Sequence, residues 1–272
     1  MITKAIIPVA GYGTRRLPIA KAIEKSMLPI LNRPLVDYVV EDCMKAGIRE
    51  FYFIVSGENT QLEKYYSEEP RLKAHLEQHG KFDLVRYAEA PQGVKMRFIP
   101  QPADGRYGTA IPVSLVAPEL QMGESVVVLM GDDFIYNPSG SSEVARLIAA
   151  TPEGGNGMLG VEVPQETVSN YGVIELNQKS EFVRIVEKPE PKDAPSNLIN
   201  VSKYVINYDL MQAIANYSNL EVSGEYLITE PINQYVLNGG SVRVVPAEGR
   251  YLDGGTVEGW LHANNVVAGL IK

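Results

Sequence analysis

The sequence predicts an α/β fold with a mixed, mostly parallel central sheet that is flanked by helices. In the first half of the chain, short runs of branched apolar residues alternate with segments of helical periodicity. That order is typical of parallel strands covered by helices. The second half is richer in strand-like runs that are joined by turns, and we therefore expect a mixed sheet.

The first half of the chain contains both kinds of segment in alternation. Apolar runs predict strands at 5–9, 51–55, 95–100 and 125–130. Helical patterns predict helices from about Pro34 to Gly47, over 60–80 and over 107–117. Proline in a first turn and glycine after the last turn are common helix boundaries, and apolar residues recur on one stripe between them.

The second half continues without a break in composition. Strands are predicted at 158–163, 171–175, 182–189, 198–206 and 242–246, and helices at 208–217, 225–238 and 256–271. No internal repeat and no linker separates two independent units. We therefore expect a single domain over 1–272, in which an N-terminal half, about 1–135, packs against a C-terminal half, about 136–272.

Composition excludes several classes of protein. A net charge of −8 argues against a general surface for nucleic acid or for anionic membranes. The single Cys43 excludes an intramolecular disulfide and a cysteine-based zinc site, and its apolar neighbours favour a buried structural thiol. No apolar run approaches the ~20 residues that span a bilayer, and the first strand begins almost at Met1, so we expect a soluble cytoplasmic protein without a signal peptide.

The most informative segment directly follows the first predicted strand. It contains Gly11-Tyr12-Gly13-Thr14-Arg15, and then Lys21 and Lys25. Glycines at a strand end let bare backbone N–H groups approach a ligand, and such groups suit phosphate oxygens. The basic side chains would add positive charge beside them. The segment therefore predicts a binding site for a triphosphate.

Two better-known phosphate loops do not match this segment. The dinucleotide fingerprint needs a third glycine where this chain has Arg16, which counts against a dehydrogenase. The Walker pattern needs Gly-Lys followed by Ser or Thr, and no stretch of the sequence supplies it.

Acidic residues follow the strand at 125–130. Asp132 and Asp133 come directly after Gly131, so parallel strands would place them at the same sheet edge as the glycine loop. Carboxylates there could bind Mg²⁺, which takes oxygen ligands and often shares substrate phosphates. Asp253, in a glycine-rich turn, could be a second ligand of one metal. A turn or helix-capping role remains the alternative for these residues.

Other polar segments are less specific. Glu187-Lys188-Pro189 ends a strand, where the lysine could neutralise a phosphate group of an acceptor, although a surface ion pair is the ordinary alternative. Gln101 could match a pyrimidine base edge, and otherwise is a loop side chain. His75 and His79 lack the zincin arrangement and are assigned no role.

Taken together, these motifs resemble those of the sugar-phosphate nucleotidyltransferases, most closely the bacterial UTP–glucose-1-phosphate uridylyltransferase branch. The matching motifs occur in the family's order over nearly the whole chain. They are Gly11-Tyr12-Gly13-Thr14-Arg15, Leu17-Pro18, Lys21-Ala22-Ile23, Lys25, Met27-Leu28-Pro29-Ile30, Gly131-Asp132-Asp133, Tyr171-Gly172-Val173, Glu187-Lys188-Pro189, Ala194-Pro195-Ser196-Asn197-Leu198, Gly224-Glu225 and Asp253-Gly254-Gly255-Thr256.

The resemblance implies a Rossmann-like nucleotidyltransferase fold and the transfer of a uridylyl group from UTP to glucose 1-phosphate, with Mg²⁺ as cofactor and UDP-glucose and pyrophosphate as products. It also implies a homo-oligomer, either a dimer or a tetramer. The implied nucleotide-binding residues, in the N-terminal half, are Ala10, Gly11, Gly13, Thr14, Arg15, Gln101, Gly108 and Thr109. The implied sugar-phosphate-binding residues are Asp133, Gly172, Glu187, Lys188 and Asn197. Arg15, Lys25 and Lys188 would be catalytic, and Asp132 and Asp253 would bind the metal.

Two segments depart from the pattern of the uridylyltransferases. Arg106-Tyr107-Gly108-Thr109-Ala110 replaces the usual Gly-Leu-Gly-His-Ala, and Gly224-Glu225-Tyr226-Leu227-Ile228-Thr229-Glu230 replaces Gly-Glu-Ile-Gln-Leu-Thr-Asp. Both touch the implied base and sugar pockets. They leave open a thymidylyltransferase or a uridylyltransferase for another hexose 1-phosphate. A non-catalytic paralogue that binds a nucleotide sugar is an alternative of another class.

Overall fold

The computed structural model describes residues 1–57 and 60–271. One part of its central sheet is parallel and contains β6 (Ser125–Leu129), β1 (Lys4–Pro8), β4 (Glu50–Val55) and β5 (Lys95–Pro100), in that spatial order. Parallel neighbours all end at the same edge. The loops after these strands therefore lie together.

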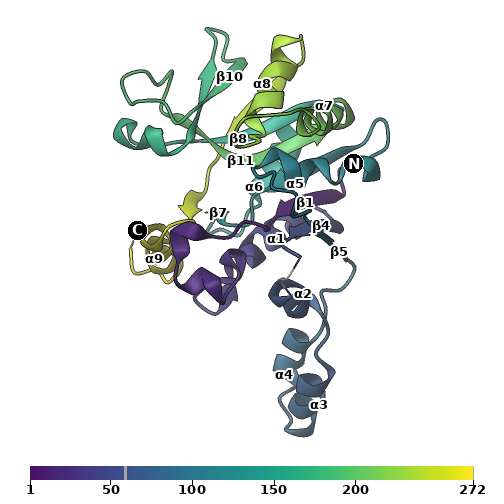
Figure 1. Cartoon of the computed structure of the whole chain (residues 1–272). Coiled ribbons are helices and arrows are strands. Elements are labelled where there is room, and N and C mark those ends of the chain that lie inside the picture. Colours follow the sequence, from purple (N-terminus) through teal and green to yellow (C-terminus); the bar gives the residue numbers. More distant parts are fainter. Residues whose placement is uncertain (58–59, 272) are drawn as a thin grey trace.

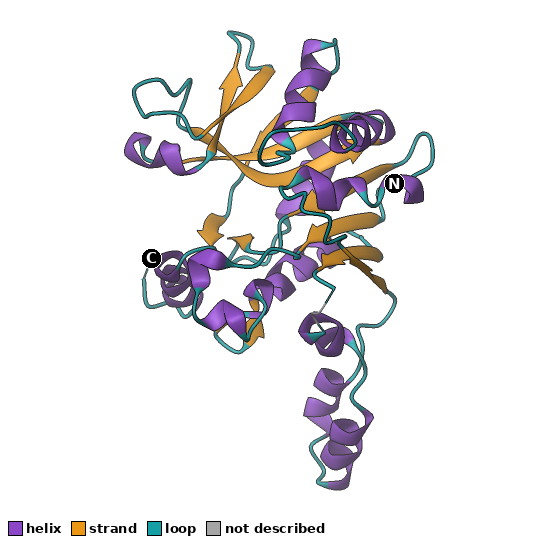
Figure 2. Ribbon diagram, in the orientation of Figure 1, coloured by secondary structure: helices purple, strands orange, loops and turns teal. Residues whose placement is uncertain are grey.

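The other part of the sheet is largely antiparallel. The long β11 (Leu198–Asn207) runs antiparallel to β6, and it also pairs with β8 (Asn156–Glu162) and β9 (Gly172–Leu176). Beyond them, β10 (Phe182–Glu187) pairs with β9, and β12 (Val242–Pro246) lies parallel to β8. The prediction of a mixed sheet within an α/β fold is confirmed (Figure 2).

Side chains of a strand point alternately to the two faces of the sheet. In the buried strands both sets are apolar, so helices cover both faces. Ile6 of β1 belongs to one apolar core, and its neighbours Ala5 and Ile7 belong to the other. The first core includes α5 (Ala110–Ser114), α7 (Tyr208–Ser218) and α8 (Thr229–Leu237). The second includes α1 (Leu35–Lys45), α6 (Glu143–Ala150) and α9 (Val257–Val267) (Figure 1).

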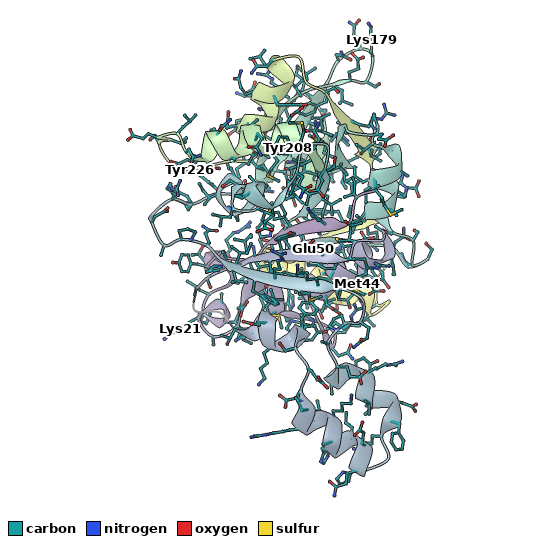
Figure 3. The ribbon with its side chains drawn as sticks, turned by 90° about the vertical axis from the view of Figure 1, so that its right-hand side faces the viewer. Lys21, Met44, Glu50, Lys179, Tyr208 and Tyr226 are labelled. Carbon is teal, nitrogen blue, oxygen red and sulfur yellow. The ribbon has the colours of Figure 1, made fainter. Side chains whose placement is uncertain are left out.

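A helical arm projects from the body of the molecule (Figure 1). It contains α2 (Gln61–Tyr66), α3 (Pro70–Gln78) and α4 (Phe82–Val85). The single helix predicted over 60–80 is thus two helices, since Pro70 starts a new one at its first position. In Figure 3 the arm extends to one end of the molecule, whereas Lys179 marks the turn between β9 and β10 at the other.

A small two-stranded ribbon was not predicted. It pairs β7 (Asp133–Tyr136) with β13 (Arg250–Asp253), which are antiparallel and more than a hundred residues apart in the chain. The helix α6 and the short pair β2 (Pro29–Ile30) and β3 (Arg33–Pro34) were not predicted either. The ribbon matters most, because it brings the two acidic segments of the sequence together.

Two predicted helices begin later than expected. The helix predicted from 107 begins at Ala110, and the helix predicted from 225 begins at Thr229. The residues before the two helices lie in loops that hydrogen-bond to each other. The Tyr226 N–H donates to the Tyr107 carbonyl, and the Ala110 N–H donates to the Tyr226 carbonyl. Gly108 between them has a φ of +120°, which a helix cannot include.

Two predictions from composition can be compared directly with the structure. Cys43 is fully buried, as predicted for a structural thiol, and this burial raises the pKa of the thiol. No helix within the described residues is both long and apolar enough to cross a bilayer.

Candidate functional site

A cavity of about 840 Å³ opens at the carboxyl edge of the parallel strands. In open α/β sheets ligands bind at this edge, and the volume is in the range of small-molecule sites. The loops after β1, β4, β5 and β6 all contribute to its lining. Of the predicted residues, it contains Ala10, Gly11, Gly13, Thr14, Arg15, Lys25, Gln101, Gly108, Thr109 and Asp132.

The two glycines of the loop after β1 play different roles. Gly13 has a φ of +63°, and a Cβ there would lie 3.2 Å from the side chains of Ala20 and Lys25. Gly13 is therefore needed by the fold itself. A Cβ at Gly11 would meet no protein atom within 4 Å, and Gly11 lies at the exposed surface of the cavity. The space beside Gly11 is open to a ligand.

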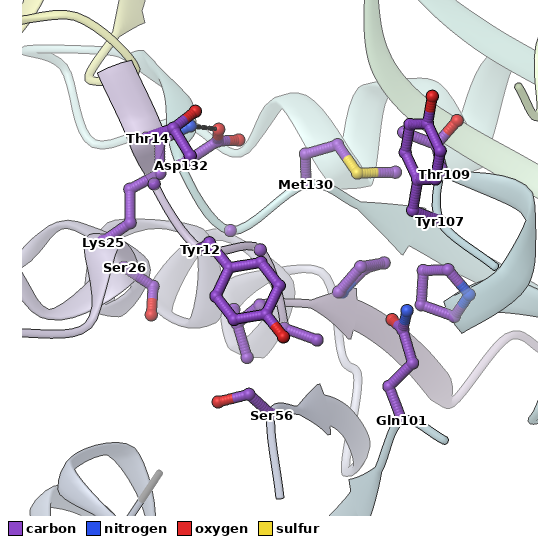
Figure 4. Close-up of a pocket in the computed structure, with 18 of the residues that line it drawn as sticks. Tyr12, Thr14, Lys25, Ser26, Ser56, Gln101, Tyr107, Thr109, Met130 and Asp132 are labelled. Carbon is purple, nitrogen blue, oxygen red and sulfur yellow. Dashed lines mark hydrogen bonds and ion pairs between the residues drawn. The ribbon is translucent and has the colours of Figure 1, made fainter. Parts of the chain in front are cut away.

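A charged pair lies at one end of the cavity (Figure 4). The Lys25 ammonium donates to the Asp132 carboxylate. Burial acts to raise the pKa of Asp132, but the charge and hydrogen bond of Lys25, helped by Lys203 and Arg15, outweigh it, and the pKa lies below its ordinary value. Asp132 is therefore a carboxylate at neutral pH, with positive charge beside it.

Asp253 is not part of the cavity lining, but the turn that follows β13 places it close to the Lys25–Asp132 pair. The Gly254 N–H donates to the Asp132 carbonyl at 3.0 Å, and Asp253 Oδ1 accepts from the Gly255 N–H at 2.6 Å. A Cβ at Gly255 would lie 3.2 Å from the Arg15 guanidinium and 3.4 Å from the Lys25 ammonium. Two predicted cations and both predicted metal ligands therefore converge on this turn.

This donor set fits a magnesium ion. Within residues 1–57 and 60–271 there is no cluster of three or more His, Cys, Asp or Glu side chains that could hold a metal. Mg²⁺ does not need one, since it is often bound by one or two carboxylates together with water and substrate phosphates. Asp132 and Asp253 supply that number of carboxylates beside the glycine loop.

The other end of the cavity carries the residues predicted for the base. Figure 4 shows Gln101 and Tyr107 there, away from the Lys25–Asp132 pair. Thr109 is held by the Ile228 N–H, which donates to its hydroxyl at 2.9 Å. A Cβ on Gly108 would lie 2.5 Å from the backbone of Tyr226. The glycine is therefore required by the contact between these two loops, and its role in binding the nucleotide stays a prediction.

The residues predicted for the sugar phosphate lie outside the lining of this cavity: Asp133 is on the β7–β13 ribbon, and the other four lie on or next to β9, β10 and β11. Gly172 and Glu187 are opposite each other on β9 and β10, and the Glu187 carboxylate accepts from the Thr229 hydroxyl at 2.7 Å. Lys188, with a φ of +45°, and Asn197 are both exposed. Their roles toward a sugar phosphate stay predictions.

Asp133 is enclosed by the protein, unlike its neighbour. It is 8% exposed; one carboxylate oxygen accepts from Lys203 and the other accepts from the Tyr251 hydroxyl at 3.0 Å. Burial raises the pKa of Asp133 to about 6, against the opposing charge of Lys203. The structure thus gives Asp133 two protein partners, and its predicted binding of the sugar phosphate stays a prediction.

Several lining residues were given no role of their own in the sequence analysis. They include Tyr12, Ser26, Ser56, Tyr107, Met130 and Glu225. Tyr12 and Tyr107 are the most informative, because both are aromatic, both line the cavity, and they are 86% and 56% exposed. An aromatic residue inside a glycine loop was the available signal for Tyr12. Nothing in the local sequence marks Ser56 or Met130.

Comparison with known proteins gives one consistent result. The family model described as nucleotidyl transferase matches residues 4–269. A putative UTP–glucose-1-phosphate uridylyltransferase of Methanocaldococcus jannaschii is 35% identical over 97% of this chain and 92% of its own length. A UTP–glucose-1-phosphate uridylyltransferase of Streptococcus pyogenes is 33% identical over 78% of this chain and 73% of its own length.

Solved structures agree with the sequence comparisons. A UTP-bound UGPase from Acinetobacter baumannii has a TM-score of 0.87 and 29% identity, and the match covers 99% of this chain and 94% of that one. A UDP-glucose pyrophosphorylase complexed with UDP-glucose has a TM-score of 0.82 and 26% identity, and the match covers both chains in full.

Proposed function

The chain belongs to the nucleotidyl transferase family, and from that premise we propose that it transfers the uridylyl group of UTP to glucose 1-phosphate, giving UDP-glucose and pyrophosphate. Family membership confirms the resemblance seen in the sequence. The choice of UTP and glucose 1-phosphate follows the relatives that carry this activity in their names and the solved structures that hold UTP or UDP-glucose.

One observation in this chain supports the proposal most strongly. Arg15, Lys25, Asp132 and Asp253 meet at the turn around Gly255, beside a glycine loop with open space at Gly11. A triphosphate and its metal need this combination of backbone N–H groups, cations and carboxylates in one place.

The reaction needs little covalent assistance from the protein. A phosphate oxygen of glucose 1-phosphate is already an anion, so it can attack the α-phosphorus of UTP without a general base. The new P–O bond forms in line as the bond from the α-phosphorus to the bridging oxygen of pyrophosphate breaks. Catalysis of such a step is positioning together with neutralisation of charge.

Each cation has a place in this scheme. Arg15 and Lys25 would neutralise the triphosphate, and Lys188 would bind the phosphate of the sugar. Asp132 and Asp253 would hold Mg²⁺, which supplies Lewis-acid stabilisation of phosphate charge when bound. Gln101, at the far end of the cavity, would hydrogen-bond to the edge of the uracil.

We further propose that the enzyme acts in the cytoplasm as a homodimer or homotetramer.

The test is product formation by the purified protein. With UTP, glucose 1-phosphate and Mg²⁺, we expect UDP-glucose and pyrophosphate in equal amounts, and we expect a chelator to abolish both. Product from dTTP at a higher kcat/KM than from UTP would keep the reaction class and correct the base. Bound nucleotide without any product would support a non-catalytic binding protein and contradict the proposal.

A further inference from the structure

Arg16 is an unusual residue for its place in the chain. It lies in the short 3₁₀ helix Thr14–Arg16 of the glycine loop, yet it is only 3% exposed, whereas Thr14, Arg15 and Leu17 around it are exposed. Arg15 and Arg16 therefore face different surroundings. Arg15 lines the cavity, whereas Arg16 is directed away from it, into the protein.

Arg16 contacts the segment that begins helix α9. Its guanidinium donates to the Thr256 carbonyl at 2.5 Å and lies 5.0 Å from the centroid of the Trp260 ring. The ring face attracts the cation. Burial acts to lower the pKa of Arg16, and the negative charge of Glu258 opposes that shift. Arginine stays protonated in proteins, so a full positive charge is buried at this junction.

Arg16 binds the carbonyl of Thr256, the last residue of the turn 253–256 that carries Asp253. Thr256 is the N-cap of α9: its hydroxyl accepts from the Gly259 N–H at 3.0 Å, and its carbonyl also accepts from the Trp260 N–H at 3.0 Å. The turn 253–256 is thus fixed at one end by the bond from Gly254 to Asp132, and at the other end by Arg16.

We propose that Arg16 is a positioning residue, which joins the glycine loop to the turn 253–256 and so holds Arg15 and Asp253 in register with each other. This inference rests on the proposed function, in which both groups act on a bound triphosphate and its metal. Arg16 itself would touch neither. It contributes hydrogen bonding and charge that a leucine or methionine at this position could not supply.

The chain carries its own reporter for this junction. Trp260 is the only tryptophan of the sequence, and the Arg16 guanidinium lies against its ring. A nucleotide that binds the glycine loop should therefore change the tryptophan emission through Arg16. This signal does not depend on turnover.

The decisive variant is Arg16→Leu, which keeps an apolar contact with Trp260 and removes the hydrogen bond and the charge. We expect kcat to fall by about 10- to 100-fold, because small misplacements of catalytic groups have effects of that order. The dissociation constant for UTP, measured by calorimetry, should change by less than kcat does. The emission change of Trp260 on UTP addition should be lost, although UTP still binds.

Three further variants separate positioning from simple loss of structure. Arg16→Lys keeps the charge and should recover part of kcat. Trp260→Phe keeps an aromatic face and should leave kcat within about threefold of wild type, since a phenyl ring still supports the contact. Arg86→Leu removes another arginine stacked on an aromatic ring, 4.9 Å from the centroid of Tyr87 on the helical arm, and should leave kcat and UTP binding unchanged.

The inference is overturned if Arg16→Leu keeps the wild-type kcat, or if its Trp260 emission still responds to UTP in full. Equal losses of kcat in Arg16→Leu and Arg86→Leu would also overturn it. If the wild-type protein makes no product from UTP and glucose 1-phosphate, the proposed function fails on its own. The emission and calorimetry experiments then use whichever nucleoside triphosphate binds, and they still decide the role of Arg16.

Discussion

Asp133 and Asp253 lie opposite each other as partners in the β7–β13 ribbon. The chain separates them widely, and the ribbon is what places Asp132, next to the first, beside the turn after the second. Asp133 faces Lys203 and Tyr251 in the interior, whereas Asp132 faces Lys25 at the cavity. Adjacent carboxylates are thereby given different surroundings, one enclosed by protein partners and one at the lining of the cavity.

Asp132→Asn tests the cavity carboxylate. Loss of its charge should lower kcat by about 10²- to 10³-fold, the range seen when one group that stabilises transition-state charge is removed. Thermal denaturation should show a folded protein. Asp83→Asn, at an exposed position on the helical arm, is the matched control and should keep wild-type turnover. Wild-type activity in Asp132→Asn would contradict the assignment.

Two glycine substitutions should have opposite consequences. A Cβ at Gly11 would meet no protein atom within 4 Å, so Gly11→Ala should keep the wild-type melting temperature. The added methyl group would occupy space open to the ligand and should weaken UTP binding by about tenfold or more. Tenfold corresponds to about 1.4 kcal/mol of binding free energy. Gly108→Ala places a Cβ 2.5 Å from the Tyr226 backbone at a φ of +120°. It should lower the free energy of unfolding by about 1–3 kcal/mol. Calorimetry and thermal denaturation of both variants provide the comparison, and a destabilised Gly11→Ala would refute the open-space argument.

Lys203→Met tests the buried pair behind the site. Lys203 is 3% exposed and paired with Asp133, so its removal leaves a buried carboxylate without its cation. Breaking such a pair from one side costs about 3–5 kcal/mol of stability. The double variant Lys203→Met with Asp133→Asn removes both charges and should recover part of that loss in chemical denaturation. A single variant as stable as the wild type would show that the pair contributes little.

Asp42→Asn gives a pH-dependent prediction. Burial raises the pKa of Asp42 above its ordinary 3.8, so ionising this carboxyl lowers the stability of the folded protein. The stability that the protonated Asp42 contributes is fully present below pH 3.8. It is lost as pH rises through the pKa of Asp42 in the folded state. Asparagine cannot ionise and can still accept from the Val144 N–H, as Asp42 Oδ2 does at 3.3 Å. The melting temperature of the variant relative to wild type should therefore be higher at pH 7 than at pH 4. A difference that does not change with pH would contradict this prediction.

Local patterns predicted the main strands because runs of apolar, mostly branched or aromatic residues between turn signals are typical of strands. The bounds of β5 and β12 match the predicted 95–100 and 242–246. Local patterns could not predict the β7–β13 ribbon, whose strands have four residues each and whose pairing depends on distant chain contacts. The late start of α5 and α8 has the same origin. It follows from the contact between Tyr107 and Tyr226, which overrides the local helical preference.

The residues of the candidate site could likewise be predicted from the sequence only in part. Glycines after a strand and an acidic pair after another strand predict a shared sheet edge, and the structure brings Gly11 and Asp132 to one cavity. The partners Lys203 and Tyr251 of Asp133 could not be predicted, because they come from β11 and β13, whose places depend on the order of strands in the sheets. The role of Arg16 was equally hidden, since its sequence neighbours are exposed loop residues.

The central claim is a uridylyl transfer to glucose 1-phosphate, and the most direct measurement is pyrophosphate release with Mg²⁺ over a matrix of UTP, dTTP, ATP and GTP against several hexose 1-phosphates. We predict the highest kcat/KM for UTP with glucose 1-phosphate, with UDP-glucose as the sugar product. Preference for another pair would contradict the substrate assignment while leaving the transfer reaction. No release with any pair, from a folded protein that binds a nucleotide, would contradict the enzymatic account itself.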